Sequence, residues 1–380
     1  MSTTKLHVVT VVGTRPEIIR LSRVISRLNT SNAIKHTLIH TGQNYDYNLN
    51  EVFFKELEIK TPDVFLECAG SSATETIGNI LIKIDPVLEQ LKPDAFLVLG
   101  DTNSCLAAIV AKKKKIPIFH MEAGNRCFDQ NVPEETNRKI VDHISDINLP
   151  YSTIAREYLL REGIQPDRVI KTGSPMAEVL MYYSEKINNS SICASLHLSR
   201  GEYFVVSSHR EENVDTLDKL EELVSILNTL VEKYDHPIVF STHPRTRNQL
   251  KKIKITPNPK IQFLEPLGFI DYVALQKNAF MVLSDSGTIS EESSILNFRA
   301  LNIRSSHERP EAMEETSVIM TDINKETILQ GIEAIASQQV DKREFNHVED
   351  YKNLNVSRKI ERIIISYTGY INKNVWKKES

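Results

Sequence analysis

Short apolar runs alternate with longer amphipathic stretches along most of the chain. β-branched and aliphatic residues fill runs such as 8–12, 95–99 and 238–241, which predicts strands buried on both faces of a parallel sheet. Between such runs apolar residues recur every three or four positions, most regularly over residues 217–234, which predicts helices. Strands that alternate with helices at this spacing indicate an α/β fold with a mostly parallel sheet.

The alternation runs through the chain twice. The first series closes with short predicted strands at 147–149 and 169–172, and the second begins at about Tyr203, after a polar stretch over 184–199 that is poor in strand formers. A chain of 380 residues also exceeds what one hydrophobic core usually supports. We therefore expect two α/β domains that are joined near Ser174.

Composition narrows the class of protein. Hydrophobic residues at 41% and charged residues at 25% are ordinary for a soluble globular chain, and a net charge of −4 gives no support for general binding to nucleic acid or membrane. The four cysteines form no CxxC pair, which argues against a zinc knuckle and a disulfide framework. The first apolar run is too short for a signal sequence or a membrane span. We expect a cytoplasmic protein.

Polar side chains follow several of the predicted strands. Arg15, Gln43, Asp101 and Glu122 each lie just beyond the carboxyl end of a strand, where functional groups of α/β sheets collect. Each of them alone has a simpler explanation, since Asp101, for example, suits the cap of the next helix. Their position at one predicted edge favours a shared functional site.

A second candidate site lies in the second half of the chain. A strand over 281–283 leads into Ser284-Asp285-Ser286-Gly287-Thr288, and a predicted helix with Glu291 and Glu292 follows at once. Unpaired N–H groups and the positive end of the helix dipole make such a loop suitable for a phosphate. Glu292 could accept hydrogen bonds from a ribose diol, which favours a nucleotide. A capped helix after a buried strand would show the same residues.

Eight motifs, taken together and in this order, resemble those of the non-hydrolysing UDP-N-acetylglucosamine 2-epimerases. They are GTRPE at 13–17, TGQ at 41–43, GDT at 100–102, EAG at 122–124, PEE followed by Asn137-Arg138 at 133–138, HREEN at 209–213, DSG followed by Glu291-Glu292 at 285–292, and ERPE at 308–311. Any one of them is a weak signal, but the set covers nearly the whole chain.

The resemblance implies an α/β fold of the glycosyltransferase-B type, with two Rossmann-like domains and a cleft between them. The domains would span residues 1–174 and 175–355, and a last helix within 356–380 would cross back to the first domain. It also implies an isomerase that inverts C2 of a UDP-N-acetylhexosamine without metal or cofactor, in surface-polysaccharide precursor synthesis. UDP would be eliminated to give a 2-acetamidoglucal and re-added on the opposite face. Members are usually homodimers.

The chemistry implied by the resemblance explains the residue types. The C2 proton is weakly acidic, so a carboxylate must remove it while cations and N–H dipoles stabilise departing UDP, and inversion needs a proton from the other face. The catalytic residues implied are Asp101, Glu122, Glu134 and His209. The substrate-binding residues implied are Arg15, Arg20, Gln43, Arg138, Arg210, His243, Arg245, Phe269, Ser286, Gly287, Thr288, Glu292 and Arg309.

Simpler roles stay open for some of these residues. Glu134 and Glu135 also suit the first turn of a helix, where acids are favoured, and His243 beside Pro244 could be structural. Two other functions stay open as well. The chain could be a retaining glycosyltransferase that uses a UDP-sugar donor, or an inactive UDP-sugar-binding regulator.

The sequence departs from the commonest family pattern at several positions. Many members have lysine, histidine and glycine where this chain has Arg20, Asn44 and Thr288, and leucine and threonine where it has Asn125 and Cys127. Segments such as EAGNRCFDQNVPEETNR instead resemble a subgroup that serves capsule or O-antigen synthesis. That subgroup converts UDP-N-acetyl-6-deoxy-L-talosamine to UDP-N-acetyl-L-fucosamine, so the sugar is open while the inversion at C2 is common to both.

Overall fold

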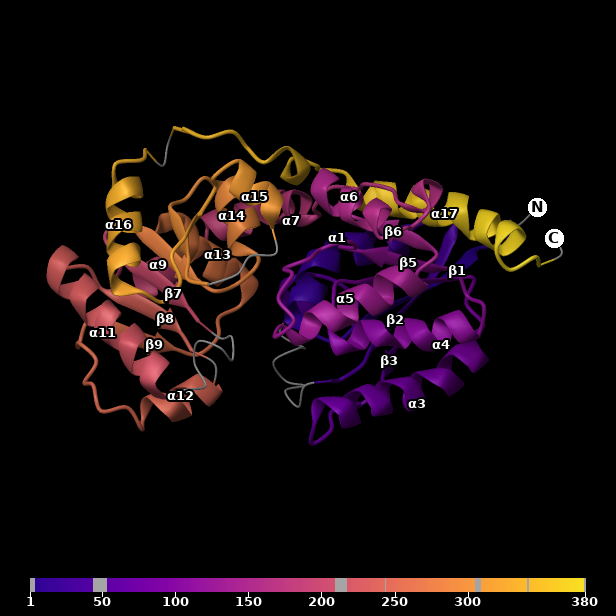
Figure 1. Ribbon diagram of the computed structural model, residues 1–380, viewed down its shortest axis with the longest axis horizontal. Helices are drawn as coiled ribbons and strands as arrows, with labels where there is room; N and C mark the ends of the chain where they lie inside the picture. Colours follow the sequence, from indigo (N-terminus) through magenta and orange to yellow (C-terminus); the bar gives the residue numbers. More distant parts are fainter. Residues whose placement is uncertain are drawn as a thin grey trace. The chain divides into compact units, whose positions relative to one another are not determined.

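The computed structural model describes residues 4–43, 53–208, 217–242, 244–304, 309–339 and 342–378. The chain divides into two compact units, whose helices and strands are labelled in Figure 1. Unit 1 comprises Met1–Met181 with Asp350–Ser380, and unit 2 comprises Tyr182–Glu349. Each unit is built on one six-stranded sheet whose neighbouring strands are all parallel.

The sheet of unit 1 has the strand order β3-β2-β1-β4-β5-β6. Its strands are β1 (Leu6–Val12), β2 (Ile34–His40), β3 (Val64–Phe65), β4 (Ala95–Leu99), β5 (Ile118–Met121) and β6 (Ile147–Leu149). This is the order of a Rossmann fold, in which the chain changes direction across the sheet between β1 and β4. The loops that follow these two strands therefore lie side by side at the carboxyl edge, where such folds bind ligands.

Helices cover both faces of this sheet (Figure 1). The helices of this part of the chain are α1 (Arg15–Thr30), α3 (Ala73–Leu91), α4 (Ala108–Lys113), α5 (Pro133–Ile144), α6 (Thr153–Arg161), α7 (Met176–Tyr182) and α17 (Val356–Asn374). Ile80, Ile84 and Leu88 of α3 pack with apolar residues of α4 and α5 against one face. On the other face, α1 contacts α17, and Arg27 Nε lies 2.6 Å from Glu361 Oε2. The last helix of the chain is thus part of unit 1.

Unit 2 repeats the same connectivity with the strand order β12-β11-β10-β7-β8-β9. Its strands are β7 (Phe204–Ser207), β8 (Ile238–Ser241), β9 (Ile261–Leu264), β10 (Met281–Ser284), β11 (Ala300–Asn302) and β12 (Ile319–Met320). Its helices are α8 (Ser184–Asn188), α9 (Ile192–Ser195), α11 (Leu217–Tyr234), α12 (Pro244–Leu250), α13 (Phe269–Asn278), α14 (Ile289–Leu296), α15 (Pro310–Glu314) and α16 (Lys325–Ala336). The prediction of an α/β chain with two Rossmann-like domains is confirmed.

One predicted strand is wrong. The strand expected over 169–172 is reduced to a single bridge between Asn148 and Val169, because Pro150, just after β6, accepts the N–H of Thr172 at 3.0 Å but has no N–H to complete a second bridge. The stretch over 184–199, expected to be polar and poor in strands, forms the short helices α8 and α9. Among the described residues, no helix is long and apolar enough to cross a membrane.

Candidate active site

Glu17 joins the two loops at the switch point of unit 1. Its Oε2 accepts hydrogen bonds from the N–H groups of Gly13 at 2.9 Å and Thr14 at 2.7 Å, and its Oε1 accepts one from the hydroxyl of Thr102 at 2.9 Å. Thr14 and Glu17 stand at the spacing of a capping box, so the carboxylate also caps α1. It thereby fixes the backbone next to Arg15 and Asp101, both of which were predicted as site residues. The fully buried Glu17 was not predicted.

Gln43 lies beside these loops as predicted. Its Oε1 accepts hydrogen bonds from the backbone N–H of Ser104 at 3.0 Å and from the Ser104 hydroxyl at 2.7 Å. The loop after β1 passes so close that a Cβ on Gly13 would lie 1.9 Å from the Ser104 Oγ. Close approach of the backbone is therefore the reason for glycine at this position. Arg15, at the start of α1, places its guanidinium 5.0 Å from the ring centre of Phe53.

Arg138 holds two carboxylates together. Its Nε donates to Asp101 Oδ2 at 2.7 Å, and its Nη1 donates to Glu135 Oε2 at 2.9 Å. Asn137 supports the same loop by donating to the backbone carbonyl of Asp101 at 2.9 Å. The structure thus brings the predicted residues Asp101 and Arg138 into direct contact. It adds the buried Glu135, which the sequence offered only as a helix-start acid.

Glu122 follows β5 and is held at both carboxylate oxygens. The guanidinium of Arg20, which α1 places in the interior of unit 1, contacts Glu122 Oε2, and Asn125 Nδ2 donates to Glu122 Oε1 at 3.2 Å. Glu122 adopts a φ of +64°, a left-handed conformation that is uncommon for a residue other than glycine. Such strain at the end of a buried strand is typical of functional sites. Arg20 and Glu122, both predicted as site residues, are therefore paired.

A network of buried charged side chains lies next to the turn that carries Glu122. Asp142 of α5 accepts hydrogen bonds from the N–H of Gly124 and from Arg126 Nη1, and its Oδ1 lies 2.9 Å from Nδ1 of His120. Burial alone would raise the pKa of Asp142, but His120 and Arg126 outweigh it and lower that pKa. Asp142 is therefore a buried anion that fixes the turn. No signal in the sequence distinguished it from other polar residues of a helix.

Glu134 differs from the other predicted carboxylates. It lies half-buried in the first turn of α5, and within the described ranges its side chain makes no hydrogen bond or ion pair. The side chains of His209, Arg210, His243 and Arg245, which complete the predicted set, lie outside the described residues. Their predicted roles are thus carried by the sequence alone.

The predicted phosphate loop lies at the switch point of unit 2. It follows β10, next to the end of β7, and the Ser208 hydroxyl donates to Asp285 Oδ2 at 3.0 Å. Ser286 Oγ lies 3.0 Å from Thr288 Oγ1 and accepts the Thr288 N–H at 3.3 Å. Thr288 has the helical φ of −77°, so this backbone does not require glycine. The loop opens α14, whose N-terminus can attract an anion.

The first turn of α14 carries two buried glutamates with separate partners. Glu292 Oε2 accepts a hydrogen bond from Gln276 Nε2 at 2.7 Å, and Glu291 Oε2 lies 3.6 Å from Nη2 of Arg309. Gln276 is buried in α13, which begins at Phe269. The predicted residues Glu292 and Arg309 thus lie around the first turn of α14, whereas Phe269 begins α13 and has its ring centre 6.0 Å from that of Tyr183. Gln276 was not predicted, since it looks like any core-facing position of a helix.

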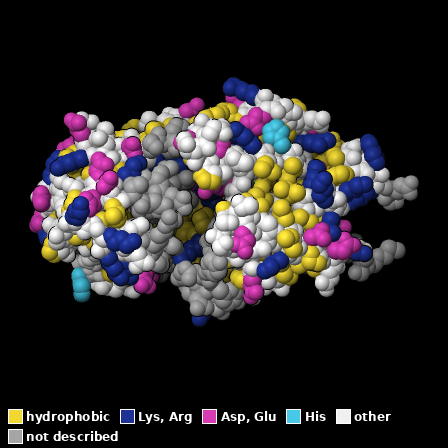
Figure 2. All heavy atoms as spheres, turned by 60° about the horizontal axis from the view of Figure 1, so that its bottom comes forward, with side chains coloured by type: hydrophobic (Ala, Val, Ile, Leu, Met, Phe, Trp, Pro, Cys, Tyr) yellow, Lys and Arg dark blue, Asp and Glu magenta, His cyan; other side chains and the backbone are white. Residues whose placement is uncertain are grey.

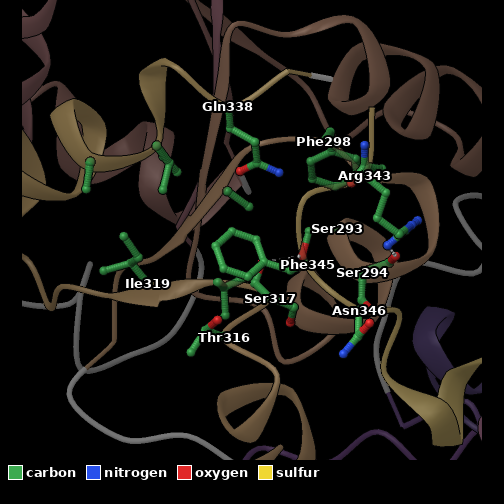
Figure 3. A pocket seen from close by; sticks show the side chains of 15 residues that line it. Ser293, Ser294, Phe298, Thr316, Ser317, Ile319, Gln338, Arg343, Phe345 and Asn346 are labelled. Atoms are coloured by element: carbon green, nitrogen blue, oxygen red, sulfur yellow. Dashed lines mark hydrogen bonds between the residues drawn. The ribbon is translucent and has the colours of Figure 1, made fainter. Parts of the chain in front are cut away.

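A pocket in unit 2 lies at the other end of α14 (Figure 3). Its volume is about 230 Å³, and Phe298, Ser317, Gln338 and Phe345 are among its lining residues. Arg343 at its mouth donates to the carbonyls of Ser294 and Ile295, so its guanidinium caps the helix. None of the predicted site residues lines this pocket. Within the described parts of the chain, no group of three or more His, Cys, Asp or Glu could hold a metal ion.

Comparisons with known proteins agree on one family. A family model described as UDP-N-acetylglucosamine 2-epimerase matches residues 26–365. The UDP-N-acetylglucosamine 2-epimerase of Methanocaldococcus jannaschii is 38% identical over 337 residues, which cover 87% of this chain and 92% of that protein.

Two solved structures extend the likeness to the fold. The structure of UDP-N-acetylglucosamine 2-epimerase from Rickettsia bellii has a TM-score of 0.92 and 51% identity, and the match covers 99% of this chain and 100% of that one. The Methanocaldococcus jannaschii enzyme in complex with UDP-GlcNAc and UDP has a TM-score of 0.88 and 35% identity, with 95% and 100% covered.

Proposed function

The chain belongs to the UDP-N-acetylglucosamine 2-epimerase family, and we propose that it inverts the configuration at C2 of a UDP-N-acetylhexosamine. The observation that carries this proposal is the arrangement of Asp101 and Glu122. Each is paired with an arginine, and they follow the adjacent parallel strands β4 and β5. Neighbouring carboxylates at the carboxyl edge of a Rossmann sheet suit proton transfer to and from a bound sugar.

The reaction needs a base, an acid and a stabilised leaving group. One carboxylate removes the proton from C2, the C–H electrons form the C1=C2 double bond, and the C1–O bond breaks so that UDP departs with its electron pair. UDP then attacks C1 again while a second carboxyl group returns a proton to the opposite face of C2. All atoms of the substrate are recovered, and only the configuration at C2 changes.

We assign the proton transfers to unit 1. Arg138 and Arg20 favour the charged forms of Asp101 and Glu122, so either carboxylate can serve as the base while another carboxyl group, which must be protonated, serves as the acid. Glu134 is the third candidate, and His209 is expected to assist. At least two carboxyl groups are required, because the proton leaves from one face of the sugar and returns to the other.

We assign the nucleotide to unit 2. The N–H groups of Ser286, Gly287 and Thr288 at the start of α14 suit the diphosphate, whose oxygens would replace the Ser284 and Ser286 hydroxyls that accept two of these N–H groups. Glu292, oriented by Gln276, suits the ribose diol. Arg15 is expected to bind the diphosphate, and the remaining predicted residues, Phe269 beside the uracil among them, are expected to complete the substrate contacts. N–H dipoles and cations there would stabilise the charge on departing UDP.

The test is isotope exchange at C2. The protein is incubated in D2O with UDP-N-acetylglucosamine and, in a parallel sample, with UDP-N-acetyl-6-deoxy-L-talosamine, and deuterium at C2 is followed by NMR. Exchange with the first sugar supports UDP-N-acetylglucosamine as the substrate. Exchange with only the second supports the formation of UDP-N-acetyl-L-fucosamine for surface polysaccharide. Asp101→Asn should abolish exchange without loss of UDP binding. No exchange with any UDP-N-acetylhexosamine would contradict the proposal.

We also propose that the protein acts in the cytoplasm as a homodimer. Hydrophobic side chains gather on the side of unit 1 where α3 and α4 lie (Figure 2). Ile82 of α3 is 71% exposed, and Val87 of α3 and Val110 of α4 are only partly buried. Light scattering should report a dimer that Ile82→Arg dissociates, whereas Ile365→Arg, at an exposed isoleucine of α17, should leave it intact. A monomeric wild-type protein would refute the dimer.

A further inference from the structure

The exposed side of α17 carries a stripe of cations with no acid among them. Arg358, Arg362, Ile365, Gly369 and Lys373 are all exposed, and they recur every three or four positions along the 19 residues of the helix. Residues at this spacing lie on one side of a helix. The buried residues of α17 recur on the opposite side and pack against the rest of unit 1. The stripe therefore faces solvent along most of this helix, which is labelled in Figure 1.

The cations of the stripe are not neutralised within the described residues. There, the side chains of Arg358, Arg362 and Lys373 form no hydrogen bond or ion pair. The single acid of α17 is Glu361, which is buried and paired with Arg27 of α1. The positive charge of the stripe is thus open to an anion outside the protein.

Acids on neighbouring segments are held by other groups. Glu178 of α7 accepts the backbone N–H of Ser357 at 2.8 Å, and Asp167 accepts the hydroxyl of Tyr370 at 2.7 Å. By contrast, exposed lysines at the end of α11 and just before β9 are paired with exposed acids. A local excess of positive charge therefore lies on α17, although the whole chain has a net charge of −4.

Apolar and aromatic side chains accompany this charge. Ile365 lies in the middle of the stripe and is 45% exposed. Trp376 follows the helix and stays partly exposed, with its ring centre 5.0 Å from Nζ of Lys112. Aliphatic groups and tryptophan enter the interfacial region of a bilayer, while arginine and lysine reach the phosphate groups. A polynucleotide would also attract the cations, but it offers no apolar region for an isoleucine.

We propose that this stripe of α17 docks the protein on an anionic phospholipid membrane. Lipid phosphates face Arg358, Arg362 and Lys373, and Ile365 enters the interface between them. Each cation near an anionic surface strengthens binding about 5-fold, and the attraction falls off within the Debye length. So few groups give weak and reversible binding. None of these residues belongs to the candidate active site, and the proposal does not rest on the proposed function.

The test is sedimentation of the full chain with phospholipid vesicles. One set contains phosphatidylcholine alone, and the other contains phosphatidylcholine with the anionic phosphatidylglycerol. The protein should sediment with the second set only. Raising the salt from about 0.1 M to about 1 M shortens the Debye length from about 10 Å to about 3 Å and should release the protein. The double variant Arg358→Gln, Arg362→Gln should bind the anionic vesicles about 25-fold more weakly.

A matched double variant separates this surface from charge in general. Lys219→Gln with Lys325→Gln removes the same charge from exposed positions of α11 and α16, and its binding should stay within about 2-fold of the wild type. Glutamine has nearly the helix propensity of arginine and lysine, and circular dichroism checks that each variant is folded. Equal binding by the two double variants would overturn the proposal.

Ile365→Ser distinguishes a lipid surface from a polynucleotide. It keeps every charge and removes the group that enters the interface, so binding to the anionic vesicles should fall about 3- to 10-fold. Unchanged binding by this variant, equal sedimentation with both sets of vesicles, or no sedimentation of the wild type would overturn the proposal. Binding to polyuridylic acid without sedimentation with the anionic vesicles would also overturn it and would make the stripe a nucleic-acid surface.

Discussion

Replacement of Glu17 by glutamine tests whether a buried carboxyl group in unit 1 titrates near neutral pH. Burial is the largest influence on Glu17 and raises its pKa from 4.5 to about 7, against hydrogen bonds from Gly13, Thr14 and Thr102 that favour the charged form. In the unfolded chain the group returns to its ordinary pKa. The folded protein therefore binds this proton more tightly. Glu17 contributes stability at low pH that is lost as the pH rises from 4.5 to about 7.

The size of this effect follows from proton linkage. A rise in pKa from 4.5 to about 7 corresponds to about 3 kcal/mol once the pH is above both values. Between about pH 5 and about pH 8, the stability that the bound proton contributes falls by about 2.5 kcal/mol. The glutamine of Glu17→Gln does not titrate. Its amide N–H faces the N–H and O–H groups that donate to Glu17, and the stability lost in this way is the same at every pH. The wild-type free energy of unfolding minus that of the variant should therefore fall by about 2.5 kcal/mol across this interval.

The measurement uses the single tryptophan of the chain. Trp376 belongs to unit 1, where its ring centre lies 5.0 Å from Nζ of Lys112, so its fluorescence during urea unfolding reports on the unit that contains Glu17. The control is Glu75→Gln, at an exposed glutamate near the start of α3 whose pKa is lowered by hydrogen bonds from Ser71. The stability difference for this control should not fall as the pH rises. A flat or rising difference for Glu17→Gln would show that its hydrogen-bond donors outweigh burial.

Three other substitutions test the packing and partners of the site. Gly13→Ala sets a Cβ against a serine hydroxyl and should lower the stability of unit 1 by about 1–3 kcal/mol in the same urea assay. Asp142→Asn leaves the charge of Arg126 less well compensated and should cost about 3 kcal/mol, again by tryptophan fluorescence. Gln276→Leu removes the donor to Glu292 and should weaken UDP binding about 3- to 10-fold by calorimetry, with the urea midpoint of unit 1 unchanged.

The regular part of the fold was readable because parallel strands that are buried on both faces leave continuous apolar runs. The predicted bounds of β4, β8 and α11 agree with the structure, since apolar residues make up most of the two strands and recur every three or four positions along the helix. Strands β3 and β12 have two residues each, which is too short for any period to show. They exist because longer neighbouring strands offer backbone partners, a condition that the local sequence does not carry.

The sequence predicted many residues of the candidate site but not the contacts between them. Asp101 and Arg138 are separated by 37 positions, and their pairing depends on α5 packing beside the loop after β4. Glu17 could have been found, because Thr14-x-x-Glu17 before an apolar run has the spacing of a capping box. Asp142 could not, because its importance comes from Gly124 and its other partners on a neighbouring loop. A sequence pattern shows the periodicity of one helix or strand, whereas these contacts join residues of several helices, strands and loops.

Several buried charges of unit 1 lie next to the strand ends that carry the proposed chemistry. Asp142 lies under the Glu122 turn, and Arg138 joins Asp101 to Glu135 beside it. Buried ion pairs lose hydration that their attraction only partly restores, so apolar residues could pack these positions with equal or greater stability. What apolar residues could not do is fix a carboxylate in one orientation. Proton transfer at C2 tolerates little displacement, so we attribute these buried pairs to the geometry of the site and not to the stability of the fold.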